Sequence, residues 1–117
     1  MGRQRTIRQN PWGWRSMWII AMFDLPTDTP KARKAYARFR TDLLKDGFTM
    51  MQYSIYIRHC ASIENAKVHV ARMGKCVPTA GEVRFLTITD KQFGRTQVFV
   101  GKNREKPPSP PAQLEFF

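Results

Sequence analysis

Hydrophobic residues run without interruption from position 17 to position 23 and stop at Asp24. A continuous apolar run of this length is typical of a strand that is buried on both faces, so we expect a strand here. Asp24 then marks the point where the chain leaves the core, before the turn-forming segment 25–30. Because functional side chains commonly lie at the ends of such strands, Asp24 is the first candidate site residue.

Two segments have the apolar spacing of amphipathic helices. In the first, Thr29 and Pro30 predict the N-cap and the first helical residue, and Gly47 predicts the C-terminal end. In the second, Ser62 is the expected N-cap and Gly74 ends the pattern. The apolar stripes consist of Ala32, Tyr36, Phe39 and Leu43 in the first helix and of Ile63, Ala66, Val70 and Met73 in the second.

Further strands are expected on both sides of the second helix. Segments 48–51 and 53–58 predict two short strands that join at Gln52, and segment 82–90 predicts a longer one. A short fifth strand is expected at 97–100. The alternation in 82–90 places apolar residues on both faces, whereas the alternation in 53–58 predicts one wetter face. That wetter face carries Ser54, Tyr56 and Arg58.

The expected order of elements is strand, helix, strand, strand, helix, strand. This is the split βαβ pattern, so the predicted fold class is α+β, with a ferredoxin-like four-stranded antiparallel sheet and both helices on one face. Two helices cover only one face of such a sheet. Strands that are apolar on both faces need a second cover, which another copy of the chain supplies most simply. We therefore expect a homodimer.

Three regions are expected along the chain: a basic arm at 1–16, the ferredoxin-like domain at 17–101 and a proline-rich tail at 102–117. The first boundary follows the composition, because the arm contains four arginines and no acid. The tail ends in the apolar, strand-like segment 113–117. Since an uncovered sheet edge attracts an extended segment, we expect 113–117 to pair with the partner's sheet edge.

Charge narrows the class of partner. Among 117 residues, 20 are lysine or arginine and 9 are aspartate or glutamate, which gives a net charge of +11. With 42% hydrophobic residues the chain has material for a core, which excludes a disordered polybasic tail. A folded basic domain most often meets phosphate, so nucleic acid is the expected partner, with an anionic membrane surface as the alternative.

The distribution of apolar residues also predicts where in the cell the protein is found. No apolar run approaches the ~20 residues that cross a bilayer, so we expect no membrane span. The basic N-terminus is not followed by the apolar region of a secretory signal, and we expect a cytoplasmic protein. Cys60 and Cys76 lack the CxxC spacing and fit reduced core thiols better than a disulfide or a zinc site.

Basic residues dominate the first predicted helix. Between positions 31 and 46 there are six bases and two acids. Two interpretations stay open, an ordinary solvated face and a surface that binds nucleic acid. The candidate nucleic-acid-binding residues are Lys31, Lys34 and Arg38 on the face away from the apolar stripe, with Arg33 and Arg40 on its flank.

Several short motifs, in order, resemble the CRISPR-associated protein 2 family. They are FDLP at 23–26, Arg33 one turn into the following helix, GF at 47–48 and MQYSIY at 51–56. The segment LTITDKQF at 86–93 resembles the members that accompany type II CRISPR systems. The resemblance covers about residues 17–101, and several motifs in order are more specific than any one of them.

The resemblance implies a ferredoxin-like homodimer that helps to install new spacers in a CRISPR array. In that family the dimer joins two dimers of the integrase subunit, CRISPR-associated protein 1, and holds the spacer-precursor DNA duplex. Many members are described as Mg²⁺-dependent endonucleases that act on RNA or DNA. The resemblance assigns their catalytic, metal-binding carboxylate to Asp24, with one copy from each subunit.

The chemistry allows that assignment and also a simpler one. Mg²⁺ takes one or two carboxylates and keeps its waters, which two copies of Asp24 can provide. Alternatively, Asp24 caps the following turn. Asp28 is either a second oxygen ligand or, as we favour, a turn residue. His59 and His69 are expected to pack or to be solvated rather than to carry protons.

Three functions therefore stay open. The first is an adaptor that binds duplex DNA in the spacer-acquisition complex. The second is a stand-alone metal-dependent endoribonuclease of the toxin type that acts at paired Asp24. The third is a ferredoxin-like RNA-binding module, which would use exposed aromatic residues on the sheet, with Tyr53 and Tyr56 as candidates. Only the first predicts the integrase subunit as the dominant partner in a pull-down from the host.

Overall fold

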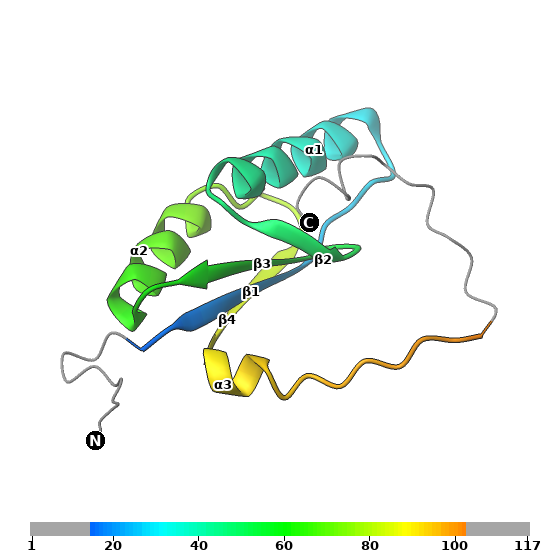
Figure 1. Ribbon diagram of the computed structural model, residues 1–117. Coiled ribbons are helices and arrows are strands. Elements are labelled where there is room, and N and C mark those ends of the chain that lie inside the picture. Colours follow the sequence, from blue (N-terminus) through cyan, green and yellow to red (C-terminus); the bar gives the residue numbers. More distant parts are fainter. Residues whose placement is uncertain (1–14, 103–117) are drawn as a thin grey trace, which may run out of the picture.

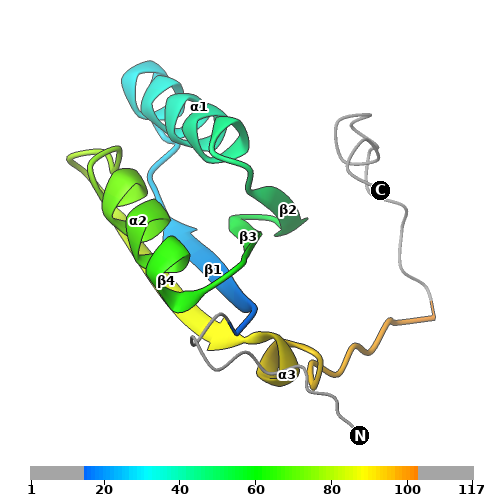
Figure 2. The ribbon, with the colours of Figure 1, turned by 60° about the vertical axis from the view of Figure 1, so that its left-hand side comes forward.

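The computed structural model describes residues 15–102. Within them, one antiparallel sheet has the strand order β2-β3-β1-β4, and α1 and α2 lie together on one side of it (Figures 1 and 2). This is the predicted α+β arrangement with the long first strand in the interior of the sheet. The elements are β1 (Met17–Asp24), α1 (Pro30–Lys45), β2 (Thr49–Gln52), β3 (Ile55–Cys60), α2 (Ile63–Gly74), β4 (Glu82–Thr89) and α3 (Asp90–Phe93).

The helix ends follow the predicted local signals. Thr29 and Ser62 are the N-caps of α1 and α2, and each side-chain oxygen accepts a hydrogen bond from a backbone N–H in the first turn. Pro30 is the first residue of α1. Gly47 follows the C-cap of α1 with φ +94°, a conformation that glycine adopts without the strain of a Cβ. Local sequence therefore sets where both helices begin and where α1 ends.

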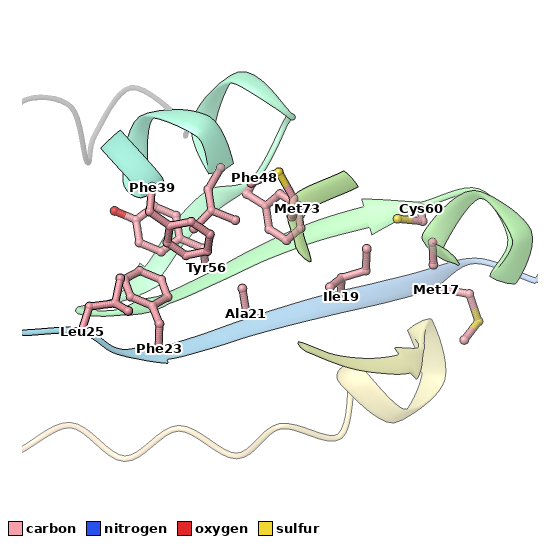
Figure 3. Close-up of a cluster of buried hydrophobic side chains, with 12 residues drawn as sticks. Met17, Ile19, Ala21, Phe23, Leu25, Phe39, Phe48, Tyr56, Cys60 and Met73 are labelled. Carbon is pink, nitrogen blue, oxygen red and sulfur yellow. The ribbon is translucent and has the colours of Figure 1, made fainter. Parts of the chain in front are cut away.

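The core lies between the sheet and the two long helices. Side chains of β1 alternate between buried and half-buried, and Ile19, Ala21 and Phe23 point toward the helices (Figure 3). Phe23 makes edge-to-face contact with Phe39 of α1, with ring centroids 5.3 Å apart. The buried residues that complete the cluster are Met17, Leu25, Leu43, Phe48, Tyr56, Cys60, Ala66 and Met73.

The opposite sheet face, which we call the open face, carries the other half of β1. Trp18, Ile20 and Met22 are half-buried there, because α1 and α2 do not reach this side. Strand register aligns Ile20 with Ile57 of β3 and with Leu86 of β4. Both faces of β1 are thus apolar, as the sequence predicts, but one of them keeps substantial contact with solvent in the single chain.

A short helix, α3, covers one end of the open face. The Phe93 ring stacks on Trp18 with centroids 4.4 Å apart, and Trp18 Nε1 donates a hydrogen bond of 2.6 Å to Asp90 Oδ1. Thr89 and Gln92 form a reciprocal capping box at the start of α3. The sequence interpretation extended the fourth strand to Asp90 and included no helix here. The correction is that β4 ends at Thr89, because its side chain caps the turn that follows.

The hairpin between β2 and β3 also differs from the prediction. The strands join at Tyr53 and Ser54 rather than at Gln52, and a register shift lies between Met50 and Gln52. Ser54 has φ +62°, and its carbonyl accepts a hydrogen bond of 3.1 Å from the Phe23 N–H. The turn is therefore placed by its contact with β1, which the local pattern does not contain.

The predicted wetter face of β3 is wrong, since that face packs against the helices. Tyr56 and Cys60 are buried there, and the guanidinium of the half-buried Arg58 donates hydrogen bonds to backbone carbonyls. Its Nε donates to the Asp46 carbonyl at 2.7 Å and its Nη1 to the His59 carbonyl at 2.8 Å. The more exposed face carries Ile55, Ile57 and His59. Period-two spacing identified the two faces but not which one the helices cover.

Asp46 joins three elements at the end of α1. Its carboxylate is hydrogen-bonded to His69 Nδ1 at 2.7 Å and to Arg72 Nη1 at 2.6 Å, both on α2. Its carbonyl accepts the hydrogen bond from Arg58 of β3. His69 is accordingly a buried packing residue, as expected. These contacts fix how α1 lies relative to α2.

The predicted fifth strand at 97–100 is absent from the described part of the chain. Residues 97–100 are exposed and extended without strand pairing, and they run away from the sheet in both ribbon views (Figures 1 and 2). The expected terminal strand at 113–117 and nearly all of the arm at 1–16 lie outside the described residues. No helix within 15–102 has the length and apolar character needed to cross a membrane.

The two cysteines are free thiols. Cys60 is buried in the core and Cys76 is half-buried after α2. Burial raises the pKa of both thiols, so both are protonated at neutral pH. Cys60 lies in the core, as expected for a core thiol, whereas Cys76 is only half-buried.

Candidate nucleic-acid interface

Asp24 is the last residue of β1 and is exposed. Since residues two apart on a strand share a face, Asp24 lies on the open face with Trp18, Ile20 and Met22. The backbone of Gly81, which has φ +96°, packs closely against the backbone of Asp24. A Cβ at Gly81 would lie 2.8 Å from the Asp24 carbonyl oxygen. Close approach of the loop before β4 therefore requires glycine and holds the end of β1 in place.

The register brings a second carboxylate opposite Asp24. Glu82, the first residue of β4, is the cross-strand partner of Asp24 and lies on the same face. Arg84 lies two residues further along that face, and its Nη2 donates to Glu82 Oε2 at 3.2 Å. Glu82 was expected as a strand residue but not as a site residue. The sequence shows only an acid at the start of a predicted strand. That this acid lies opposite Asp24 depends on the register between β1 and β4, which the local sequence does not contain.

The donor set at Asp24 fits a hard cation but is incomplete in one chain. Exposed carboxylate oxygens are the ligands that Mg²⁺ prefers, and Mg²⁺ commonly takes one or two of them with water in the remaining positions. Among residues 15–102, no group of three or more His, Cys, Asp and Glu side chains has the geometry to hold a metal ion. A metal at Asp24 would therefore draw its other protein ligand from Glu82 or from a second copy of the chain.

Asp28 occupies a different environment. It lies in the bend before α1 and lines a cavity of about 400 Å³ that Asp24 does not line. The cavity lies between the loop after β1, the first turns of α1 and the loop before β4, and Tyr36 and Lys31 also line it. Its position in a bend agrees with the favoured interpretation of Asp28 as a turn residue.

The basic residues of α1 form the second part of the site, which we call the cationic face: Lys31, Arg33, Lys34, Arg38 and Arg40. Four of them are exposed and Arg40 is half-buried. Arg33 Nη1 donates to the Thr27 carbonyl at 3.1 Å, which ties the loop after Asp24 to the helix. None of the ion pairs found within residues 15–102 involves these five side chains.

The two acids near the end of α1 do little to neutralise that face. Asp46 is engaged by His69 and Arg72 of α2, and Asp42 is half-buried. A run of cations without ion-paired acids attracts anions such as the phosphates of nucleic acid. The cationic face therefore has the charge expected of a phosphate-binding surface.

Aromatic side chains near the cationic face differ sharply in exposure. Tyr56 is buried, and burial raises the pKa of its hydroxyl, an effect that the nearby Arg40 cation opposes. It is therefore no base-stacking residue, and the suggestion that Tyr56 binds RNA is wrong. Tyr53, in contrast, is 75% exposed at the hairpin tip. His59 packs edge-on against Trp18 with ring centroids 5.1 Å apart, as a packing residue would.

Residues 17–96 match the protein family described as CRISPR associated protein Cas2. The chain belongs to this family. Among similar proteins, the CRISPR-associated endoribonuclease Cas2 of Parvibaculum lavamentivorans is 75% identical over 101 residues, covering 86% of this chain and all of the relative. The CRISPR-associated endoribonuclease Cas2 of Flavobacterium psychrophilum is 51% identical over 104 residues, covering 89% of this chain and 90% of the relative.

A solved structure supports the fold. A crystal structure of a Cas2 protein aligns with a TM-score of 0.51 at 18% identity, covering 79% of this chain and 97% of that one. At this identity the likeness concerns the fold alone. The family membership predicted from the short motifs is confirmed, and the family match begins at Met17, the first residue of β1.

Proposed function

We propose that this Cas2 family chain is the nucleic-acid-binding subunit of CRISPR spacer acquisition. As a homodimer it binds the spacer-precursor DNA duplex and joins dimers of the integrase subunit, CRISPR-associated protein 1. The observation that carries the proposal is the cationic face of α1, which has no ion-pair partner among residues 15–102. Sequence-independent phosphate contacts suit a subunit that must accept spacers of any sequence. A protein with this role acts in the cytoplasm, where the array DNA lies.

The open face supports the homodimer. Leu86, the β4 neighbour of Ile20, is 48% exposed, and the apolar residues Val98, Phe99 and Val100 are exposed after α3. Apolar surface of this kind, beside a sheet face that no helix of the chain covers, is typical of a protein interface. A second copy packed against it would bring the two copies of Asp24 toward each other across the interface, since Asp24 lies on the same face.

Metal-dependent phosphodiester cleavage is the second candidate function. The curated relatives are named endoribonucleases, and Asp24 is an exposed carboxylate on the open face. In this proposal Asp24 from each subunit holds Mg²⁺, which supplies Lewis-acid stabilisation and activates water when bound. The Asp24 carboxylates fix the position of the cleaved phosphate, and the cationic face holds the flanking phosphates of RNA or DNA.

The salt dependence of duplex binding tests the proposed DNA contacts. We expect the log of the binding constant to fall with the log of the salt concentration by about 0.9 for each phosphate contact. Replacing Arg33, Lys34, Arg38 or Arg40 singly by alanine should reduce the magnitude of this slope by about one for each contacting residue. Lys67→Ala is a matched control, because Lys67 is an exposed base on α2 whose ion pair with Glu64 is 3.9 Å long and solvent-exposed. If all four variants keep the wild-type slope, the cationic face does not contact phosphate and is an ordinary solvated surface.

Asp24→Ala separates the two candidate functions. Asp24 is exposed at a strand end, so the variant should fold, form dimers and bind the integrase subunit like the wild type. We expect spacer acquisition to continue in the assembled complex, while Mg²⁺-dependent cleavage is lost. Cleavage that persists in the purified variant would assign the nuclease to another residue. Loss of acquisition in a correctly assembled complex would show that Asp24 has a role in acquisition itself.

A further inference from the structure

Tyr53 combines high exposure with a fixed position. Its ring stacks on the ring of Tyr36, with centroids 6.2 Å apart and planes inclined by 21°. One side of the Tyr53 ring is therefore occupied by Tyr36, and the 75% exposure of the residue leaves the other side to solvent.

The stack is anchored at three points. The Tyr36 hydroxyl is hydrogen-bonded to Ser54 Oγ at 3.2 Å, and the Ser54 carbonyl accepts the Phe23 N–H at 3.1 Å. The Tyr36 ring also packs edge-on against Phe23, with centroids 5.8 Å apart. The hairpin tip is thus held against the end of β1 and against α1. Tyr53 is presented on a rigid support, which reduces the conformational entropy lost when a ligand binds.

The stack lies on the apolar side of α1, next to Arg33 and Arg40 at the flank of the cationic face. Tyr36 is three residues after Arg33 and four before Arg40, so one arginine lies a helical turn away on either side of it. Arg40 is close enough to the Tyr56 hydroxyl, on the adjoining strand, to influence its pKa. Tyr53 therefore stacks on a ring that two arginines flank, and an exposed aromatic ring near cations is the combination that binds single-stranded nucleic acid.

We propose that Tyr53 is a base-stacking residue that binds one unpaired nucleobase of a DNA strand whose phosphates lie along the cationic face. The base stacks on the side of the Tyr53 ring that Tyr36 leaves free. Bases inside a duplex already stack on their neighbours, so the ligand is an unpaired end or overhang rather than the duplex itself. Every base has such a face, and the contact is independent of sequence. The inference rests on the proposed nucleic-acid binding of the cationic face and adds a preference for unpaired bases.

Two DNA substrates and four proteins test this proposal. The substrates are a blunt duplex and the same duplex with unpaired 3′ overhangs, and binding is measured by fluorescence anisotropy at several salt concentrations. The proteins are the wild type, Tyr53→Ala, Tyr53→Phe and Val68→Ala. Phenylalanine keeps the ring, and Val68 is an exposed apolar residue on α2 that serves as a control for loss of surface area.

We expect Tyr53→Ala to weaken binding of the overhang substrate roughly 5- to 150-fold and to leave binding of the blunt duplex unchanged. Its salt slope should equal that of the wild type, because no cation is lost. Tyr53→Phe and Val68→Ala should bind both substrates like the wild type. Since Tyr53 is exposed, all variants should unfold at nearly the same temperature, which a thermal scan checks.

Each other outcome overturns the inference. Equal loss on both substrates would mean that Tyr53 supports the hairpin and contacts no base. Unchanged binding of the overhang substrate by Tyr53→Ala would show that Tyr53 does not contact the DNA. If the wild type binds neither substrate, both the proposed nucleic-acid binding and this inference are wrong. If the wild type binds DNA but Tyr53→Ala binds it equally well, only this inference is wrong.

Discussion

Replacing Asp46 by alanine is the sharpest test of how the cationic helix is held in place. The carboxylate of Asp46 is nearly buried and is the shared partner of His69 and Arg72, at 2.7 and 2.6 Å. Both partners belong to α2, so the substitution removes the polar link between the two long helices. The backbone carbonyl of Asp46 stays in place and should keep its hydrogen bond from Arg58.

The two lost contacts contribute differently to the free energy of unfolding. His69 is buried, and leaving a buried polar group without its partner costs about 1–3 kcal/mol. The Arg72 side chain is 56% exposed, and an ion pair to such a residue contributes about 0–1 kcal/mol after solvent screening. We therefore expect Asp46→Ala to lower the free energy of unfolding by roughly 2–3 kcal/mol, with most of the loss due to His69.

Urea unfolding, followed by circular dichroism at one fixed protein concentration, measures this loss. Arg72→Ala is the matched control, because it removes only the exposed contact and should cost less than about 1 kcal/mol. A loss below about 1 kcal/mol for Asp46→Ala would show that His69 finds another partner at little cost. Equal losses in the two variants would mean that Arg72, despite its exposure, provides the link.

Two further predictions concern the homodimer, and both are measured by light scattering. Leu86→Asp should weaken dimer formation because it places a charge on the open face. Val68→Asp, on α2, is the matched control and should not, since Val68 is similarly exposed, at 52% against 48% for Leu86. If both variants form dimers equally well, the open face is not the dimer interface. A chain that ends at Gly101 should form a less stable dimer, because it lacks the apolar segment 113–117 that we expect on the partner's sheet edge. An equally stable dimer would show that the tail lies outside the interface.

Features that depend on neighbours in sequence were predictable. Three features of α1 are found where expected: the N-cap at Thr29, the proline at the first helical position and the glycine after the C-cap. Each depends only on contacts and backbone conformation within a few residues. The order of strands and helices follows from apolar spacing, and the ferredoxin-like sheet follows from that order. The short motifs were sufficient for the family, since they occur together in the same order.

The candidate site was predicted in part. Asp24 and the bases of α1 could be found because a strand end and a helix face are visible in the spacing of residues. Glu82 could not be found, because its place opposite Asp24 depends on the register between β1 and β4, whose sequences are nearly sixty residues apart. Tyr53 was a candidate from the sequence together with Tyr56, but the exposure of Tyr53 alone depends on a turn that Phe23 holds in place.

The amino-acid sequence by itself determined the two long helices, the four strands and their order, the sign of the charge on α1 and the family. Tertiary structure alone decided that Tyr56 is buried and Tyr53 exposed, that α3 covers one end of the open face, and that Asp46 joins α1 to α2. The physical reason is the range of the interactions. Helix caps and alternation are set within a few residues, whereas the face that is covered and the side chains that meet depend on packing between segments far apart in the chain.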